Sequence, residues 1–131
     1  ELRPIQKHYE KAEVDLNTNW RFRTQWDEKV SFVDGRKGKQ TFEVGKDFAD
    51  FLVWRKDGFA SYELATVVDD HLMEISEIVR GEDLLVSSAR QCVLFAALNW
   101  APPQFYHCEL VLDGKGRKLS KSERNLPRLI L

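Results

Sequence analysis

Apolar residues change their spacing along the chain, and these changes predict its strands and helices. Aromatic and polar residues alternate over 20–26, which is the two-residue period of a strand. Two further β-prone runs, 30–33 and 40–44, flank the turn-rich sequence DGRKGK and predict a hairpin. The apolar run 51–54 predicts a buried strand. The segment 20–54 is therefore expected to consist of strands and turns.

The apolar spacing then lengthens to three and four residues, which predicts a helix. A short strand follows over 75–79 and stops at Arg80-Gly81. A second amphipathic helix follows that strand, with Ser87 or Ser88 as its expected N-cap. The run FYHCELVL predicts one more strand. The apolar positions of the first helix are Leu64, Val67, Val68, Leu72 and Met73.

The order of these elements indicates an α/β fold, because strands and helices alternate over 51–125. In open α/β sheets, ligands bind beyond the carboxyl ends of the strands. Two features follow such ends: the Arg80-Gly81 pair, and the glycine- and lysine-rich loop that begins near Gly114. Both could therefore face one crevice.

Composition and charge narrow the choice of ligand. The chain has 131 residues, enough for one domain with an ordinary core, and its net charge is −1. The segment 113–131 holds six Lys or Arg against two Asp or Glu, a local charge of +4. A positive charge confined to one segment indicates a local anion site rather than a general nucleic-acid surface. Free thiols are the expected state of the two cysteines, and no apolar run is long enough for a membrane helix.

The basic loop has the residue types of a phosphate site. Gly114 and Gly116 permit close approach of the backbone to a ligand. Lys118 and Lys121 lie three residues apart, and their ammonium groups would stabilise charge that builds on phosphate oxygens. Ser120 adds a hydroxyl donor. The alternative is a solvated basic turn with no ligand.

The sequence also resembles a known family. KLSKS resembles the second signature, KMSKS, of class I aminoacyl-tRNA synthetases, with Leu in the Met position. The runs SYELATVVDD and IVRGEDLLVSSARQ precede it in the order and at the separations of the glutamyl and glutaminyl enzymes. This resemblance covers roughly residues 19–131. The preceding strand and hairpin region is most similar to glutamyl-queuosine tRNA(Asp) synthetases, which are short paralogues.

The resemblance implies roles for particular residues. Tyr62 matches the tyrosine that contacts the amino-acid substrate, and Arg80 matches the arginine that pairs with the glutamate side-chain carboxylate. A guanidinium can hold a carboxylate with two parallel hydrogen bonds, which agrees with that role. Lys118 and Lys121 match the lysines that stabilise the ATP phosphates during activation. The implied ATP-binding residues are Lys118, Leu119, Ser120 and Lys121.

The same resemblance implies a fold and a division of the chain. The fold class is α/β, as half of a class I synthetase Rossmann-like catalytic domain with an N-terminal antiparallel β-hairpin region. Residues 1–50 would form the N-terminal segment and hairpin of a connective region. Residues 51–131 would form the second half of the catalytic domain and end in the KLSKS loop. The first class I signature, HIGH, and the zinc-binding cysteines of some paralogues do not occur in this sequence.

The implied reaction joins glutamate and ATP, with Mg²⁺, to give glutamyl-adenylate and pyrophosphate. The glutamyl group then passes to tRNA, with the queuosine base of tRNA(Asp) as the favoured acceptor, and the expected location is cytoplasmic. The alternative is a truncated remnant that folds without activating glutamate and binds nucleotide or RNA weakly or only pairs with itself. A half domain would expose a sheet edge and an apolar face, so a twofold homodimer is a further expectation.

Two details of the sequence modify this expectation. Thr66 stands where discriminating glutamyl enzymes often have Asn, and Glu74 stands where relatives commonly have Gly. The carboxylate pair Asp69 and Asp70 is expected to be structural rather than catalytic, because the substrate carboxylate is itself the nucleophile in adenylation.

Overall fold

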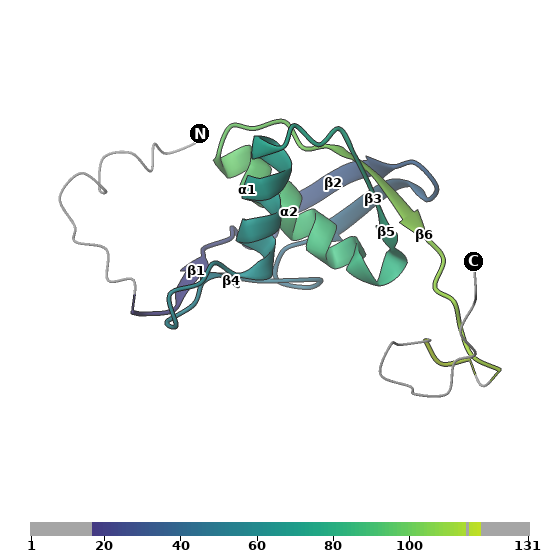
Figure 1. Cartoon of the computed structure of the whole chain (residues 1–131), viewed down its shortest axis with the longest axis horizontal. Helices are drawn as coiled ribbons and strands as arrows, with labels where there is room; N and C mark the ends of the chain where they lie inside the picture. Colours follow the sequence, from purple (N-terminus) through teal and green to yellow (C-terminus); the bar gives the residue numbers. More distant parts are fainter. Residues whose placement is uncertain (1–16, 115, 119–131) are drawn as a thin grey trace.

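The computed structural model describes residues 17–114 and 116–118 (Figure 1). Two helices pack together on one side of a four-stranded sheet, and a separate two-stranded sheet lies beside them. The elements are β1 (Trp20–Phe22), β2 (Lys29–Asp34), β3 (Gly38–Glu43), β4 (Phe51–Trp54), α1 (Tyr62–Leu72), β5 (Glu77–Gly81), the 3₁₀ turn η2 (Glu82–Leu84), α2 (Leu85–Ala97) and β6 (Gln104–Cys108).

The larger sheet has the strand order β3-β2-β6-β5 and is of mixed type. β5 and β6 run parallel, β6 and β2 run parallel, and β2 and β3 form the predicted antiparallel hairpin. The carboxyl ends of β2, β5 and β6 therefore lie at the same edge, where ligands are expected in α/β sheets. The expected α/β class is confirmed.

The smaller sheet corrects one part of the expected topology. β4 was expected to precede α1 as a strand of the α/β series, but it pairs antiparallel with β1 and lies outside the larger sheet. The predicted strand 20–26 also ends earlier, at Phe22. The chain turns inward there because Thr24 donates hydrogen bonds from its backbone N and its Oγ1 to Asp50, at 2.8 and 2.9 Å.

The start of α1 follows the capping rules. Ser61 is its N-cap, and the Ser61 Oγ accepts a hydrogen bond from the backbone N of Leu64 at 3.3 Å. The expected caps of α2 are wrong, because that helix begins at Leu85, directly after η2. Ser87 and Ser88 lie inside the helix, where their hydroxyl groups bond to side chains and to one carbonyl of the preceding turn.

The core lies between the helices and the sheets, whereas the opposite face of the larger sheet is open. On that opposite face Val33, Val79 and Tyr106 come from three neighbouring strands and are exposed. Among the described residues, no helix is long and apolar enough to cross a membrane. The buried apolar core consists of Val44, Phe48, Phe51, Val67, Ala89, Leu94 and Phe95.

Candidate functional site

Arg80 lies near the carboxyl end of β5, and its side chain points toward the helices rather than outward. Its Nη2 donates a hydrogen bond to Oε1 of Gln91 in α2 at 2.7 Å. Its guanidinium also lies over the ring of Phe105 in β6, 5.1 Å from the ring centroid. These contacts from two elements fix the guanidinium in one orientation.

Gln91 is fully buried and connects Arg80 to a buried carboxylate. Its Nε2 donates a hydrogen bond to Oε2 of Glu63 in α1 at 3.0 Å. The other oxygen of Glu63 accepts a hydrogen bond from Ser87 at 2.9 Å and lies 3.7 Å from Nη1 of Arg90. Because the Gln91 amide nitrogen faces Glu63, its oxygen must face Arg80. We call Arg80, Gln91, Glu63, Ser87 and Arg90 the Arg80 network.

The Arg80 network leaves donors of Arg80 unused. Its Nε is buried and has no hydrogen-bond partner among the described residues. Oδ2 of Asp70, in α1, is likewise buried without such a partner. Burial raises the pKa of Asp70, and the charge of Arg80 opposes that rise, so the two groups interact. The structural role expected for Asp70 and the carboxylate-binding role expected for Arg80 both stay predictions.

Tyr62 is the first residue of α1, next to Glu63 of the Arg80 network. Tyr62 is 57% exposed. Among the described residues, no recorded hydrogen bond joins Tyr62 to Arg80. Their joint role in binding glutamate therefore stays a prediction.

Lys118 is the only one of the four predicted ATP-binding residues that the structure describes; Leu119, Ser120 and Lys121 lie outside the described residues. A bridge between Leu112 and Lys118 closes a turn, within which the backbone N of Asp113 donates to the Arg117 carbonyl at 2.7 Å. The ammonium group of Lys118 forms an ion pair with Asp83 of η2. This contact with Lys118 lowers the pKa of Asp83.

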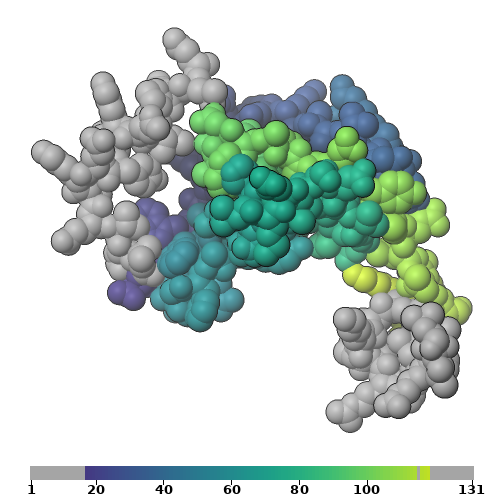
Figure 2. Space-filling model, turned by 45° about the horizontal axis from the view of Figure 1, so that its top comes forward, coloured from purple at the N-terminus to yellow at the C-terminus, as the bar shows by residue number. Residues whose placement is uncertain are grey.

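The Asp83–Lys118 pair brings the basic loop to the end of β5. η2 follows directly on β5, so Lys118 lies at the edge of the sheet where β5 and β6 end. Figure 2 shows the segment after β6 projecting from the body of the molecule at this edge. The structure thus brings Lys118 to Asp83 at this edge, whereas the expectation that Arg80-Gly81 and the loop face one crevice stays a prediction. The Arg80 side chain itself turns into the interior.

A second group of charges joins the hairpin to the same edge. Nε of Arg36 donates to the carbonyl of His107 at 2.5 Å, and its Nη1 and Nη2 contact Glu109 and Glu82 at 2.9 and 2.6 Å. Nζ of Lys37 also contacts Glu82, at 2.8 Å, and this contact lowers the pKa of Glu82. The hairpin turn is thereby held against the ends of β5 and β6.

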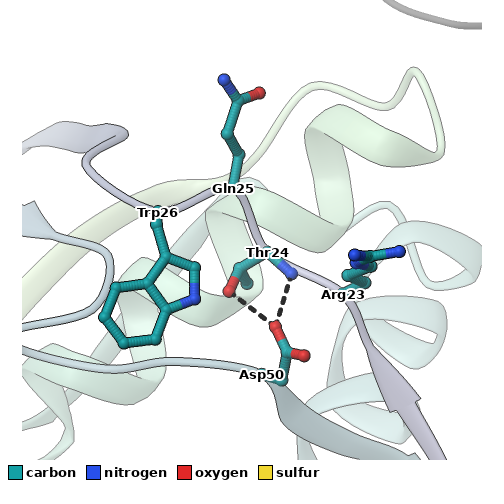
Figure 3. Close-up of a pocket in the computed structure, with 5 residues that line it drawn as sticks. All are labelled: Arg23, Thr24, Gln25, Trp26 and Asp50. Atoms are coloured by element: carbon teal, nitrogen blue, oxygen red, sulfur yellow. Dashed lines mark hydrogen bonds between the residues drawn. The ribbon is translucent and has the colours of Figure 1, made fainter.

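A shallow hollow lies elsewhere, beside the smaller sheet (Figure 3). Asp50 is at its base, hydrogen-bonded to Thr24, and the exposed ring of Trp26 forms one side. Gly45 has a positive φ and lies so close to Trp26 that an added Cβ would be 2.6 Å from the indole. None of the predicted site residues lines this hollow.

The remaining chemistry-bearing residues that the structure describes include one buried thiol and no metal-binding group. Burial raises the pKa of the Cys92 thiol to about 11, so this thiol stays protonated and unreactive near neutral pH. Within 17–114 and 116–118, no group of three or more His, Cys, Asp or Glu side chains could hold a metal ion.

Comparison with known proteins identifies the class to which this fold and site belong. The sequence model described as tRNA synthetases class I (E and Q), catalytic domain, matches residues 3–129. The chain therefore belongs to the class I tRNA synthetase family of the E and Q type, and the resemblance noted in its motifs is confirmed.

Individual relatives refine the placement. The glutamyl-Q tRNA(Asp) synthetase of Xanthomonas campestris pv. campestris (strain 8004) is 44% identical over 116 residues, which are 88% of this chain and 39% of that protein. The glutamate–tRNA ligase of Lactobacillus gasseri is 39% identical over 106 residues, 80% of this chain and 20% of that protein.

A solved structure agrees with these sequence relatives. A glutamate tRNA ligase from Elizabethkingia meningosepticum, crystallised in complex with its amino acid, has a TM-score of 0.70 and 35% identity, covering 77% of this chain and 20% of that one. The chain thus spans less than half the length of the relatives described above.

The sequence interpretation missed the residues that hold Arg80 and Lys118. Gln91 lies 11 residues from Arg80 and 28 from Glu63, and Asp83 lies 35 residues from Lys118. No local spacing connects such pairs, because each joins different elements. The one signal in the sequence was Gln91 itself, an amide on the same helix face as the apolar Leu94 and Phe95.

Proposed function

We propose that this chain is the glutamate-recognising part of a class I synthetase that activates glutamate with ATP. The observation that carries the proposal is the Arg80 network, in which a buried amide holds a guanidinium whose Nε has no partner among the described residues. A guanidinium so held is complementary to a carboxylate, and its orientation is set before the ligand arrives. Tyr62, exposed at the start of α1, supplies a hydroxyl for the same substrate.

The proposed chemistry depends on charge and position. The glutamate α-carboxylate attacks the α-phosphate of ATP, an acyl-phosphate bond forms, and pyrophosphate leaves with the electron pair of the broken bond. Lys118 and Lys121 would stabilise the charge that builds on the phosphate oxygens. Mg²⁺ would arrive with ATP and neutralise part of its charge. No described residue is assigned to hold the metal ion.

The acceptor is proposed to be the queuosine base of tRNA(Asp). The support is the sequence similarity to the Xanthomonas protein, whose name specifies glutamyl-Q tRNA(Asp). The alternative acceptor is the 3′ end of a tRNA, and the similarity to proteins named glutamate–tRNA ligase supports transfer of glutamate to tRNA.

A chimera tests this proposal without assuming that the chain is complete. In this chimera, the chain replaces the matching 116 residues of the Xanthomonas relative. We expect glutamate-dependent ATP–pyrophosphate exchange, and transfer of labelled glutamate to queuosine-containing tRNA(Asp). A well-folded chimera without exchange would contradict the proposed activity. If the chimera showed pyrophosphate exchange but transferred glutamate only to a glutamate tRNA, the proposed acceptor would be wrong and the proposed activation of glutamate would stand.

One observation favours a second candidate, a folded remnant that associates with itself. The face of the larger sheet opposite the helices exposes Val33, Val79 and Tyr106, and β5 is an edge strand. Open apolar faces and strand edges promote association. Light scattering of the isolated chain at rising concentration separates a dimer from a monomer, whatever the activity of the chimera.

A further inference from the structure

Three fully buried polar side chains meet beneath the strand ends, and the proposed reaction uses none of them. Asp34 ends β2, His107 lies in β6 and Ser88 lies in α2. Nδ1 of His107 is 2.6 Å from Oδ2 of Asp34, and Nε2 of His107 is 2.7 Å from Oγ of Ser88. Exposure of the three residues is 2% or less. Each ring nitrogen therefore has one fixed polar neighbour.

The Ser88 hydroxyl group decides where the ring protons lie. Its Oγ is also 3.0 Å from the carbonyl oxygen of Leu84, which can only accept. A hydroxyl has one proton, and this proton satisfies Leu84. The Ser88 oxygen must then accept from Nε2 of His107. Because the carboxylate of Asp34 accepts from Nδ1, both ring nitrogens act as donors.

Asp34 has the surroundings of a charged carboxylate. Its oxygens accept from the His107 ring and from the backbone N–H groups of His107, Arg36 and Lys37, at 2.6 to 3.1 Å. Burial alone would raise the pKa of Asp34, but the hydrogen bonds from His107, Lys37 and Arg36 together lower it. A doubly protonated His107 would add a buried positive partner to this negative charge.

The same contacts connect the hairpin to the site. Asp34 fixes the turn that carries Arg36, and Arg36 reaches the carbonyl of His107 and the carboxylate of Glu82. His107 is also the register partner of Arg80 on the neighbouring strand. A change at the Asp34–His107 pair would therefore reach the strands that position Arg80 and Asp83.

We propose that Asp34, His107 and Ser88 form a buried clamp, with a proton on both ring nitrogens of His107, that positions the ends of β5 and β6. Asp34, His107 and Ser88 are arranged as the Asp, His and Ser of a hydrolytic triad are. However, the Ser88 hydroxyl group donates to a backbone carbonyl, and Ser88 is fully buried, so no substrate can reach it. The charged groups packed around it are Asp34 on β2, Arg36 in the hairpin turn and Arg80 on β5. The inference concerns the fold and holds whether or not the chain activates glutamate.

Nitrogen NMR of the wild-type chain tests the charge directly. An unprotonated imidazole nitrogen resonates far from a protonated one, and loss of signals in His107→Gln assigns the ring. We expect both His107 nitrogens to be protonated at neutral pH, and one proton to be lost in Asp34→Asn. A neutral His107 ring in the folded wild-type chain would overturn the proposal.

Hydrogen exchange tests the positioning role. In Asp34→Asn, the amides of Arg80 and Glu82 should exchange at least about tenfold faster, because opening of this edge becomes easier. Asp50→Asn is the matched control, since Asp50 also accepts a backbone and a side-chain hydrogen bond, but beside the smaller sheet. Asp50→Asn should change the exchange rates of these two amides by less than about twofold. Equal acceleration in both variants would show general destabilisation and overturn the positioning role.

Discussion

The two ends of the candidate site are built differently. Arg80 lies in a network of side chains from α1, α2 and β5 in which Gln91 and Glu63 are buried and the others are half-buried, with each hydrogen bond set by its neighbours. Lys118 lies on an exposed turn and is held by one ion pair, in which its own side chain is 52% exposed and that of Asp83 is 35% exposed. The first arrangement persists without ligand, whereas the second can exchange one anion for another.

Under the proposed function, this difference suits two different ligands. A carboxylate that must be distinguished from an amide needs donors of fixed geometry, and the Arg80 network provides them. A phosphate chain that leaves as pyrophosphate needs contacts that strengthen as the reaction proceeds. A lysine paired with a surface carboxylate can leave that partner at little cost in free energy.

The largest effect is expected at Arg80. In the chimera, Arg80→Ala should cost on the order of 2–5 kcal/mol in glutamate-dependent kcat/KM, because a buried substrate carboxylate would lose its partner. Pyrophosphate exchange at varied glutamate concentration measures this loss. Arg80→Lys keeps the charge without the paired donors, and near-normal activity of that variant would disprove bidentate binding.

The next effect is expected at the second lysine of the signature loop. Lys121→Ala should lower kcat for adenylation. The expected decrease corresponds to about 1.5–3 kcal/mol of activation free energy, because a hydrogen bond to a charged group is lost. The KM for ATP should rise much less, because the contact strengthens in the transition state. Steady-state exchange in the chimera separates the two parameters, and an unchanged kcat would leave this loop an ordinary basic turn.

A substitution of Gln91 tests whether the side chains of the Arg80 network depend on one another or make independent contacts. Gln91→Leu removes the acceptor of Arg80 and a donor to Glu63, and should lower the free energy of unfolding by about 1–3 kcal/mol. Urea denaturation of the isolated chain measures this change. Gln25→Leu, at an exposed glutamine, is the control and should change stability by less than about 0.5 kcal/mol. Equal values would contradict a special role for Gln91.

The sequence allowed much of the secondary structure to be predicted, because those signals are local. DGRKGK between two β-prone runs predicted the hairpin, and the three- and four-residue spacing of Leu64, Val67 and Val68 predicted α1. The predicted start of α2 was wrong because a serine can also form hydrogen bonds from inside a helix. Here Ser87 bonds to Glu63, and Ser88 bonds to His107. Local pattern could not distinguish these two uses of a serine.

The contacts that position the site could not be predicted in the same way. Asp34 and His107 are 73 residues apart in the sequence. The residues next to each of them give no sign that its side chain is buried. Tyr62 and Arg80 were predicted as substrate-binding residues by resemblance to a family, but the contact of Gln91 with Arg80 depends on how α2 packs and could not be predicted. Local motifs indicate which residues meet a ligand, whereas tertiary packing decides how they are held.

The smallest effect is expected at Asp83, and it examines the exposed end directly. Asp83→Asn removes the ion-pair partner of Lys118, and because the pair is exposed the free energy of unfolding should fall by less than about 1 kcal/mol, and less in high salt. In the chimera the same change should lower the KM for ATP by at most about fivefold, since Asp83 no longer competes with phosphate for Lys118. Asp113→Asn, which loses a pair with Arg117 in the same turn, should leave that KM unchanged. If Asp83→Asn instead raised the KM for ATP, Asp83 would be holding Lys118 in its working position, and the exposed end would be as preorganised as the buried one.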